Sequence, residues 1–364
     1  MSERAALAAA VAASPDDDLP KLVLADWLDE NGDPARAEFV RLHVAYQGEA
    51  DRFPPAHDPD KRRRLVELFA ANYRTWLKPV YDAFAQPLPA LDPEPGRPVR
   101  LGFREADSDS WHVHPQGGII VTRQGVGPLD SVILHGGLVS VLHLSPGRLS
   151  ADASFGPAQA VEPLGTLVAH LTADAGGWRR IDGPPLARVR SLSPTWDTRD
   201  DCRAVCQAIC RSDHLTGLRR MTVLPELTGG PPTAHLFDAL RHSPLRHQLT
   251  ALTAYDLPQV GHLLARSDHG FDALRSLTVS VRGRPAGADG LFAGGVSDTH
   301  RERLTRLVID TSRTHGLAWL TDGRAWERLE ELHLHGAGVG EGRVEALATA
   351  TESPHELLMV SGVG

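Results

Sequence analysis

Cysteine is scarce in this sequence, and long hydrophobic runs are absent. The three cysteines lie at positions 202, 206 and 210, and such a cluster is not the disulfide framework of a small secreted domain. No stretch approaches the roughly 18 consecutive apolar residues that a membrane-spanning helix requires. The alanine-rich N-terminus has no basic region ahead of it and is followed at once by acidic residues, unlike a secretory signal. We therefore expect a cytoplasmic protein without a membrane partner.

Lysine is also scarce, and basic charge is in deficit overall. Only three of the 38 basic residues are lysines, and the formal net charge is −8. Most of the acidic excess lies in residues 1–50, which contain ten Asp or Glu and four Lys or Arg. Because nonspecific nucleic-acid binding requires a basic surface, we expect no nucleic-acid partner.

Signatures of catalysis are absent as well. The sequence contains no nucleophile elbow with a Ser-His-Asp set, no phosphate-binding loop and no dinucleotide fingerprint. Its eighteen histidines keep a metal-dependent hydrolase open as a third hypothesis. His112 and His114, like His333 and His335, are two residues apart and share a strand face, but a metal would need a further ligand from elsewhere. We predict a non-enzymatic protein with no cofactor and no metal site.

The three cysteines are spaced four residues apart, which places them along one face of a helix. Helical rise separates Cys202 from Cys210 by roughly 12 Å, too far for both to bind one zinc ion. Because free cysteine packs as a small hydrophobic residue, we expect this cluster to form the buried face of a helix.

A pattern of the form Leu-x-x-Leu-x-apolar recurs through the C-terminal two thirds of the sequence. Its predicted copies begin at positions 139, 164, 186, 218, 249, 274, 304, 329 and 355. The steps between copies run from 22 to 32 residues, and steps of this size with one short strand each resemble leucine-rich repeats. We therefore predict an α/β fold in which residues 129–364 form an irregular leucine-rich-repeat-like solenoid with parallel strands and outer helices.

Residues 1–50 have the pattern of a compact helical module. Three helices are predicted, over residues 3–13, from a cap at Asp17 or Asp18 to Asn31-Gly32, and from Asp33-Pro34 to Gly48. The second helix has an apolar stripe that we expect to be buried, formed by Leu19, Leu22, Val23 and Trp27. Beside this stripe, Asp26 is expected to be a buried partner of Arg36 or of a backbone amide.

This module resembles the repeat-companion domain, a short module found mainly in planctomycete bacteria. The resemblance covers about residues 5–46 and depends on an ADWL-DENGDP-ARAEFVR core. The matching residues are Ala25, Asp26, Trp27, Leu28, Glu30, Gly32, Asp33, Pro34, Arg36, Ala37, Glu38, Phe39 and Arg41. The resemblance implies that the module precedes leucine-rich-like repeats, and it implies no activity, cofactor or catalytic residue.

Two segments connect the helical module to the repeats. Residues 51–95 are predicted to form a linker and a helix capped by Asp60, with Pro79 kinking or ending that helix. Residues 96–128 are predicted to form a β-hairpin cap, with VRLGF, WHVH and GIIVTR as strand candidates. Such a cap is needed because an end repeat would otherwise expose its apolar face.

In each predicted repeat the leucines are expected to point inward and the alternate residues outward. We expect this outward face to be the concave face of the solenoid and to bind another protein, since repeat proteins recognise partners over a wide surface. The predicted partner-binding residues are Arg188, Arg190, Arg220, Thr222, Tyr255, Thr278, Arg306, Asp310, Glu331 and His333. The alternative is that the acidic N-terminal module is the adaptor and the repeats are its scaffold.

Overall fold

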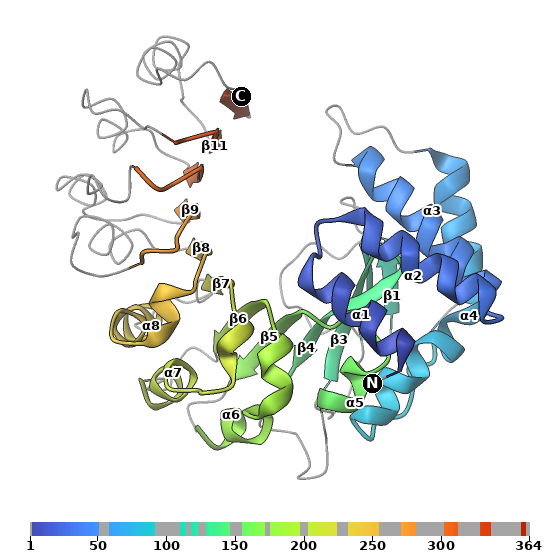
Figure 1. Ribbon diagram of the computed structural model, residues 1–364, viewed down its shortest axis with the longest axis horizontal. Coiled ribbons are helices and arrows are strands. Elements are labelled where there is room, and N and C mark those ends of the chain that lie inside the picture. The colour runs from blue at the N-terminus through green and yellow to red at the C-terminus, as the bar shows by residue number, and fades with distance from the viewer. Residues whose placement is uncertain are drawn as a thin grey trace. The chain divides into compact units, whose positions relative to one another are not determined.

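The protein forms two compact units. The computed structural model describes residues 2–50, 58–91, 110–113, 118–122, 129–145, 155–171, 175–196, 203–223, 232–254, 271–281, 302–311, 328–335 and 358–361. Unit 1 contains residues 1–171, 176–190 and 214–217, and unit 2 contains residues 172–175, 191–213 and 218–364. Helices dominate the N-terminal part of the chain and the strands that follow are mostly parallel (Figure 1). The predicted α/β class is therefore confirmed.

Helices α1 (Glu3–Ala13) and α2 (Asp18–Glu30) have the predicted bounds because their ends are capped. The Asp17 carboxylate accepts a hydrogen bond from Leu19 N at 2.9 Å, which satisfies an amide at the start of α2. At the other end, Gly32 adopts a φ of +86°, the left-handed conformation that terminates many helices. The predicted caps at Asp17 and at Asn31-Gly32 are confirmed.

Helices α3 (Pro34–Ala50) and α4 (Pro59–Ala83) each begin with a proline that follows an aspartate. Two predicted boundaries were wrong. Helix α3 continues through Gly48, since one glycine costs a helix interior only about 1 kcal/mol. The cap of α4 is Asp58 rather than Asp60, because Pro59 fits the first helical position. Pro79 lies inside α4 and does not end it.

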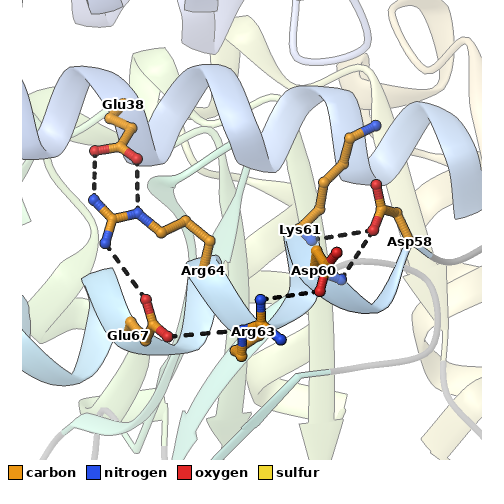
Figure 2. Close-up of polar contacts among 7 residues, drawn as sticks. All are labelled: Glu38, Asp58, Asp60, Lys61, Arg63, Arg64 and Glu67. Carbon is orange, nitrogen blue, oxygen red and sulfur yellow. Dashed lines mark hydrogen bonds and ion pairs between the residues drawn. The ribbon is translucent and has the colours of Figure 1, made fainter.

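Charged side chains connect α3 to α4 (Figure 2). Arg64 of α4 donates hydrogen bonds to both carboxylate oxygens of Glu38 on α3, at 2.8 and 2.9 Å. Arg64 also contacts Glu67 on its own helix at 3.4 Å, and Arg63 contacts Asp60 at 3.0 Å. The bonds from Arg64 lower the pKa of Glu38. Because these groups are exposed, the network contributes little to stability and mainly orients the two helices.

The apolar stripe predicted for α2 was wrong at Leu19 and Val23, because the helix buries its other side, but Trp27 of that stripe packs against the core. Leu24, Ala25 and Leu28 are at most 3% exposed and pack with α1, α3 and Leu138. Leu19 and Val23 are 66% and 44% exposed. The physical reason is that α2 is apolar over a wide arc, and the small Ala25 allows close approach to α3.

The strands of unit 1 lie in chain order in a mixed sheet. They are β1 (Ser110–Val113), β2 (Ile119–Thr122), β3 (Leu129–His135), β4 (Leu138–Leu144) and β5 (Thr166–Leu171). The pairs from β1 to β4 are antiparallel and β4 pairs with β5 in parallel. The predicted pair WHVH and GIIVTR is confirmed as β1 and β2, whereas VRLGF lies outside the described residues. The sequence did not predict β3.

The turn between β3 and β4 fits against helix α3. Gly136 and Gly137 have φ of +54° and +73°, the left-handed values that a tight two-residue hairpin requires. Gly137 N donates to Nδ1 of the fully buried His43, and Gly136 N donates to the side-chain oxygen of Gln47, both at 2.7 Å. A Cβ on Gly137 would lie 2.7 Å from the Cα of Val40. The turn between β3 and β4 therefore packs against α3 so closely that there is no room for a side chain at position 137.

A buried ion pair between Arg36 and Glu162 also connects α3 with the strands of unit 1. Glu162 lies after α5 (Phe155–Gln159) and before β5, and its side chain is 2% exposed. Both of its oxygens accept from Arg36 at 3.2 Å, one also accepts from Val139 N at 2.8 Å, and Arg4 lies 3.8 Å away. Burial lowers the pKa of Arg36, and the Glu162 carboxylate opposes that effect.

The expected pairing of Asp26 with Arg36 was therefore wrong. Asp26 is exposed and bonds to Arg41 at 2.7 Å. The guanidinium of Arg36 lies 4.8 Å from the ring centroid of Trp76, which is part of an aromatic cluster. That cluster, which also contains Phe39, Phe69 and Trp111, forms the core between the helices and the sheet of unit 1.

The other short helices of unit 1 precede or follow its strands. They are α6 (Ala175–Ile181), η2 (Pro184–Arg188) and η3 (Leu215–Gly217). Trp178 of α6 and Leu186 of η2 are fully buried. These two side chains thus add to the apolar interior of unit 1.

Unit 2 contains parallel strands joined in chain order. The strands are β6 (Ser191–Trp196), β7 (Arg220–Val223), β8 (Ala251–Ala254), β9 (Ser276–Val281), β10 (Arg306–Thr311), β11 (Glu331–His335) and β12 (Leu358–Ser361). Helices α7 (Arg203–Cys210) and α8 (Pro232–Arg241) contact each other and lie on the same side of the nearby strands (Figure 1). A short turn, η4 (Pro244–His247), precedes β8.

A backbone contact just before the strand begins recurs at each step from β7 to β11 of unit 2. The carbonyl oxygen of Arg219 accepts from two consecutive amides, those of residues 250 and 251, at 2.8 and 3.0 Å. The same contact recurs with the same distances from Thr250 to residues 275 and 276, from Arg275 to 305 and 306, and from Thr305 to 330 and 331. We refer to it as the carbonyl ladder. It keeps successive strands in one register.

Candidate protein interface

The exposed strand face of unit 2 is built by alternation along each strand. In β7, Met221 and Val223 are buried, while Arg220 is exposed and Thr222 is partly buried. Strand β8 repeats this alternation, with Leu252 and Ala254 inside. The outward residues of successive strands are therefore neighbours.

Constant register arranges these outward residues in two rows. The first row is Arg220, Ala251, Ser276, Arg306 and Glu331. The second row is Thr222, Thr253, Thr278, Val308 and His333. The rows are polar except for Ala251 and Val308, and since neighbouring strands lie about 4.8 Å apart, they form a continuous surface across five strands.

Five of the predicted partner-binding residues lie on this face with described side chains. They are Arg220, Thr222, Thr278, Arg306 and Glu331. Arg306 and Glu331 are register partners on β10 and β11, and their side chains form an ion pair of 2.8 Å with both residues about half exposed. The predicted residues therefore form two separate features, a paired charge at one end and Arg220 with the threonines at the other.

Arg188 and Arg190 do not lie on a strand, and their predicted placement was wrong. The register pairs Ser191 with Arg220, so the third repeat begins at position 189 rather than 186. Arg188 ends the turn η2, and Arg190 donates to the carbonyl of Gly217 at 3.0 Å. The corrected phase changes the neighbouring steps from 22 and 32 residues to 25 and 29.

The remaining predicted residues are described only in part. Tyr255 lies outside the described residues. For Asp310 and His333 the structure describes the backbone, which places Asp310 opposite His335 and His333 opposite Val308. The first and last copies of the pattern have the predicted phase, since β4 pairs Leu142 with Leu167 and β12 pairs Leu358 with Leu332.

A charged cluster that the sequence did not predict lies at the turns before β8, β9 and β10. Asp272 accepts from His247 at 3.0 Å and pairs with Arg303 at 3.0 Å. These two bonds, that of His247 above all, lower the pKa of Asp272. The three residues belong to successive turns, so the cluster bridges neighbouring repeats. In the sequence, only the spacing of the Leu-x-x-Leu-x-apolar copies could have indicated that these three turns are neighbours.

The cysteine cluster is part of the interior of unit 2. Cys206 and Cys210 are buried on α7, as predicted, while Cys202 lies outside the described residues. Burial raises the pKa of Cys210 to about 12, so its thiol is protonated at neutral pH. Within the described part of the chain, no group of three or more His, Cys, Asp or Glu could hold a metal ion. His112 is buried on β1, and His114 lies outside that part.

The described helices include none that is long and apolar enough to cross a membrane. Comparison with known proteins adds no relationship: no family model, no curated protein and no solved structure matches this chain.

Proposed function

We propose that unit 2 is an irregular leucine-rich-repeat-like solenoid and that the chain is a non-enzymatic scaffold, preceded by a module of the repeat-companion type. In this proposal the exposed strand face of unit 2 binds another protein. The observation that supports it most is the carbonyl ladder, which recurs with nearly identical distances between repeats of different length. A backbone held in this way presents its outward side chains in a fixed arrangement, which lowers the entropy lost on binding.

The composition of the two rows also favours protein recognition. Arg220 and Arg306 are exposed and belong to the residue type that is frequent in binding hot spots. Arg306 is held in place by its ion pair with Glu331. The threonines of the second row, on β7 to β9, offer hydrogen bonds with little side-chain entropy to lose. Such a surface suits a polar protein partner.

Charge reversal at two positions of the face tests the proposal. Full-length protein carrying Arg220→Glu and Arg306→Glu is compared with wild type in capture from native lysate, with mass spectrometry as the readout. We expect the captured protein to be lost while the thermal transition falls only slightly, because Arg306→Glu places a second carboxylate opposite Glu331. The matched control carries Arg203→Glu and Arg211→Glu, two exposed arginines at the ends of α7, and should capture normally. Undiminished capture by the first variant would contradict the proposal.

A further inference from the structure

Helix α2 carries an apolar strip on its outer side, which we call the α2 patch. It consists of Leu19, Leu22, Val23 and Trp27. Among the residues that the structure describes, Leu19 and Val23 are the exposed large hydrophobic ones, at 66% and 44%. Leu22 and Trp27 are partly buried, and Trp27 packs against the core.

The arrangement of the patch distinguishes it from scattered surface leucines, which are common and need no explanation. Leu19, Val23 and Trp27 are spaced by four residues, so they form one ridge along the helix. The opposite side of α2 already packs with α1 and α3 through Leu24, Ala25 and Leu28. The helix is therefore held in place by one apolar side while the other remains accessible.

A ridge of residues spaced by four is the surface that packs into the groove of another helix. Ridges of this kind interdigitate with the i±4 rows of a partner helix at an interaxial distance of about 8–10 Å. Trp27 is fixed at the C-terminal end of the ridge, because its indole N–H donates to Glu3 at 3.0 Å. An ordered aromatic side chain beside exposed aliphatic ones is a common anchor for a helix.

The charges around the patch are mostly negative, with Arg41 bonded to both Asp26 and Asp29. Residues 16–30 contain six carboxylates and one lysine, and that lysine, Lys21, is buried and pairs with Asp18 at 2.8 Å. Asp26 and Glu30 lie on the same side as Val23, three and seven residues further along. Asp26 bonds to Arg41 yet keeps 66% of its side chain exposed. A partner must therefore carry basic residues beside its apolar ones.

We propose that the α2 patch binds a basic amphipathic helix of another protein, with the apolar side of that helix on Leu19, Val23 and Trp27. The basic residues of the helix face Asp16, Asp26 and Glu30. The site is separate from the strand face of unit 2, so the chain has two binding surfaces of different chemistry. Either surface can fail its test without affecting the other.

Three synthetic peptides and the full-length protein test this proposal. The peptides have identical Leu spacing on one helical side, and their other positions are Lys, Gln or Glu. Fluorescence anisotropy is measured at physiological salt. We expect the Lys peptide to bind and the Gln and Glu peptides to bind at least about tenfold more weakly. Leu19→Ser with Val23→Ser should weaken the Lys peptide by about tenfold or more.

The control variants separate this site from general attraction to an acidic protein. Asp60→Asn with Glu67→Gln removes two exposed carboxylates from α4 and should leave binding unchanged, whereas Glu30→Gln should weaken it. Circular dichroism checks that each variant is folded. Equal binding of the Lys peptide to wild type and to Leu19→Ser/Val23→Ser would overturn the proposal. Concentration-dependent self-association that this variant abolishes would also overturn it, since a second copy would then occupy the patch.

Discussion

The two units are stabilised in different ways. Unit 1 depends on side chains that meet from distant parts of the sequence, such as Arg36 with Glu162, which are 126 residues apart. Unit 2 depends on a backbone contact that recurs between consecutive strands from β7 to β11. At two of these contacts the hydroxyl of Thr250 or Thr305 donates to the same carbonyl. A change at one point of unit 1 therefore removes support from several elements, whereas a change in unit 2 remains confined to neighbouring repeats.

This difference determines which side chains of each unit can be substituted without disturbing the fold. The outward residues of unit 2 take part in the carbonyl ladder through their backbone amides and not through their side chains, so the identity of those side chains can serve recognition. In unit 1, His43, Gln47 and Glu162 accept bonds from particular backbone amides. Replacing any of these three residues is therefore expected to disturb the fold of unit 1 and not only its surface.

The largest effect is expected at Glu162. Glu162→Ala leaves Arg36 buried without its carboxylate and removes the acceptor of Val139 N, which should cost about 3–5 kcal/mol of unfolding free energy. Chemical denaturation monitored by tryptophan fluorescence measures the loss. The double variant Arg36→Met/Glu162→Leu should regain most of it, since no charge is left buried. A loss below about 1 kcal/mol in the single variant would contradict the central role of this pair.

A smaller loss is expected when Gly137 is replaced by alanine. The residue has a φ of +73°, and the new Cβ would meet the backbone of Val40, so we expect a loss of about 3 kcal/mol. Gly32→Ala is the matched control, because Gly32 has a φ of +86° but no atom within 4 Å of the added Cβ. It should lose only about 1–2 kcal/mol from backbone strain. Equal losses in thermal denaturation would show that the contact with α3 is unimportant.

A local effect of about 1 kcal/mol is expected from Ser243→Ala in unit 2. Ser243 donates to the carbonyl of Cys210 at 2.6 Å and accepts from Leu245 N at 3.2 Å. Hydrogen exchange followed by mass spectrometry should show faster exchange in α7, α8 and η4 and no change in β10 and β11. Faster exchange in those distant strands would contradict the view that unit 2 responds repeat by repeat.

The smallest effect is expected from Glu38→Gln on the surface of unit 1. Because Arg64 lowers the pKa of Glu38, the folded state favours the ionised carboxylate. This contribution is present above the pKa of Glu38 in the unfolded chain and is lost as the pH falls through its folded pKa. The difference in Tm between wild type and Glu38→Gln should therefore be small at neutral pH and vanish in acid. A difference that is independent of pH would contradict the role of the ion pair.

The helix ends and most of the repeat strands could be predicted from the sequence because local chemistry decides them. Asp17 and Gly32 act within their own turns, and the leucine pattern marks each strand directly. The third repeat was predicted three residues too early because Leu186, Val189 and Leu192 are equally spaced and allow two phases. Pairing with β7 selects one of them.

The contacts of unit 1 could not be predicted because no local pattern encodes them. Nothing near Arg36 points to Glu162, and Asp26 was the more obvious partner by proximity in sequence. The sequence also did not decide which side of α2 is buried, since apolar residues occupy both sides of the helix. Packing of Ala25 against α3 decides it, and this leaves Leu19 and Val23 exposed.

The most direct test of the proposed recognition surface is site-specific photocrosslinking. Benzoylphenylalanine is placed at Thr222 or Thr278 on the exposed strand face, and at Gln207 on the exposed side of α7 as a control. After irradiation in native lysate, we expect the two strand positions to form a covalent adduct with the same protein and the control to form none. Adducts from Gln207 alone, or none from either strand position, would contradict binding through the strand face.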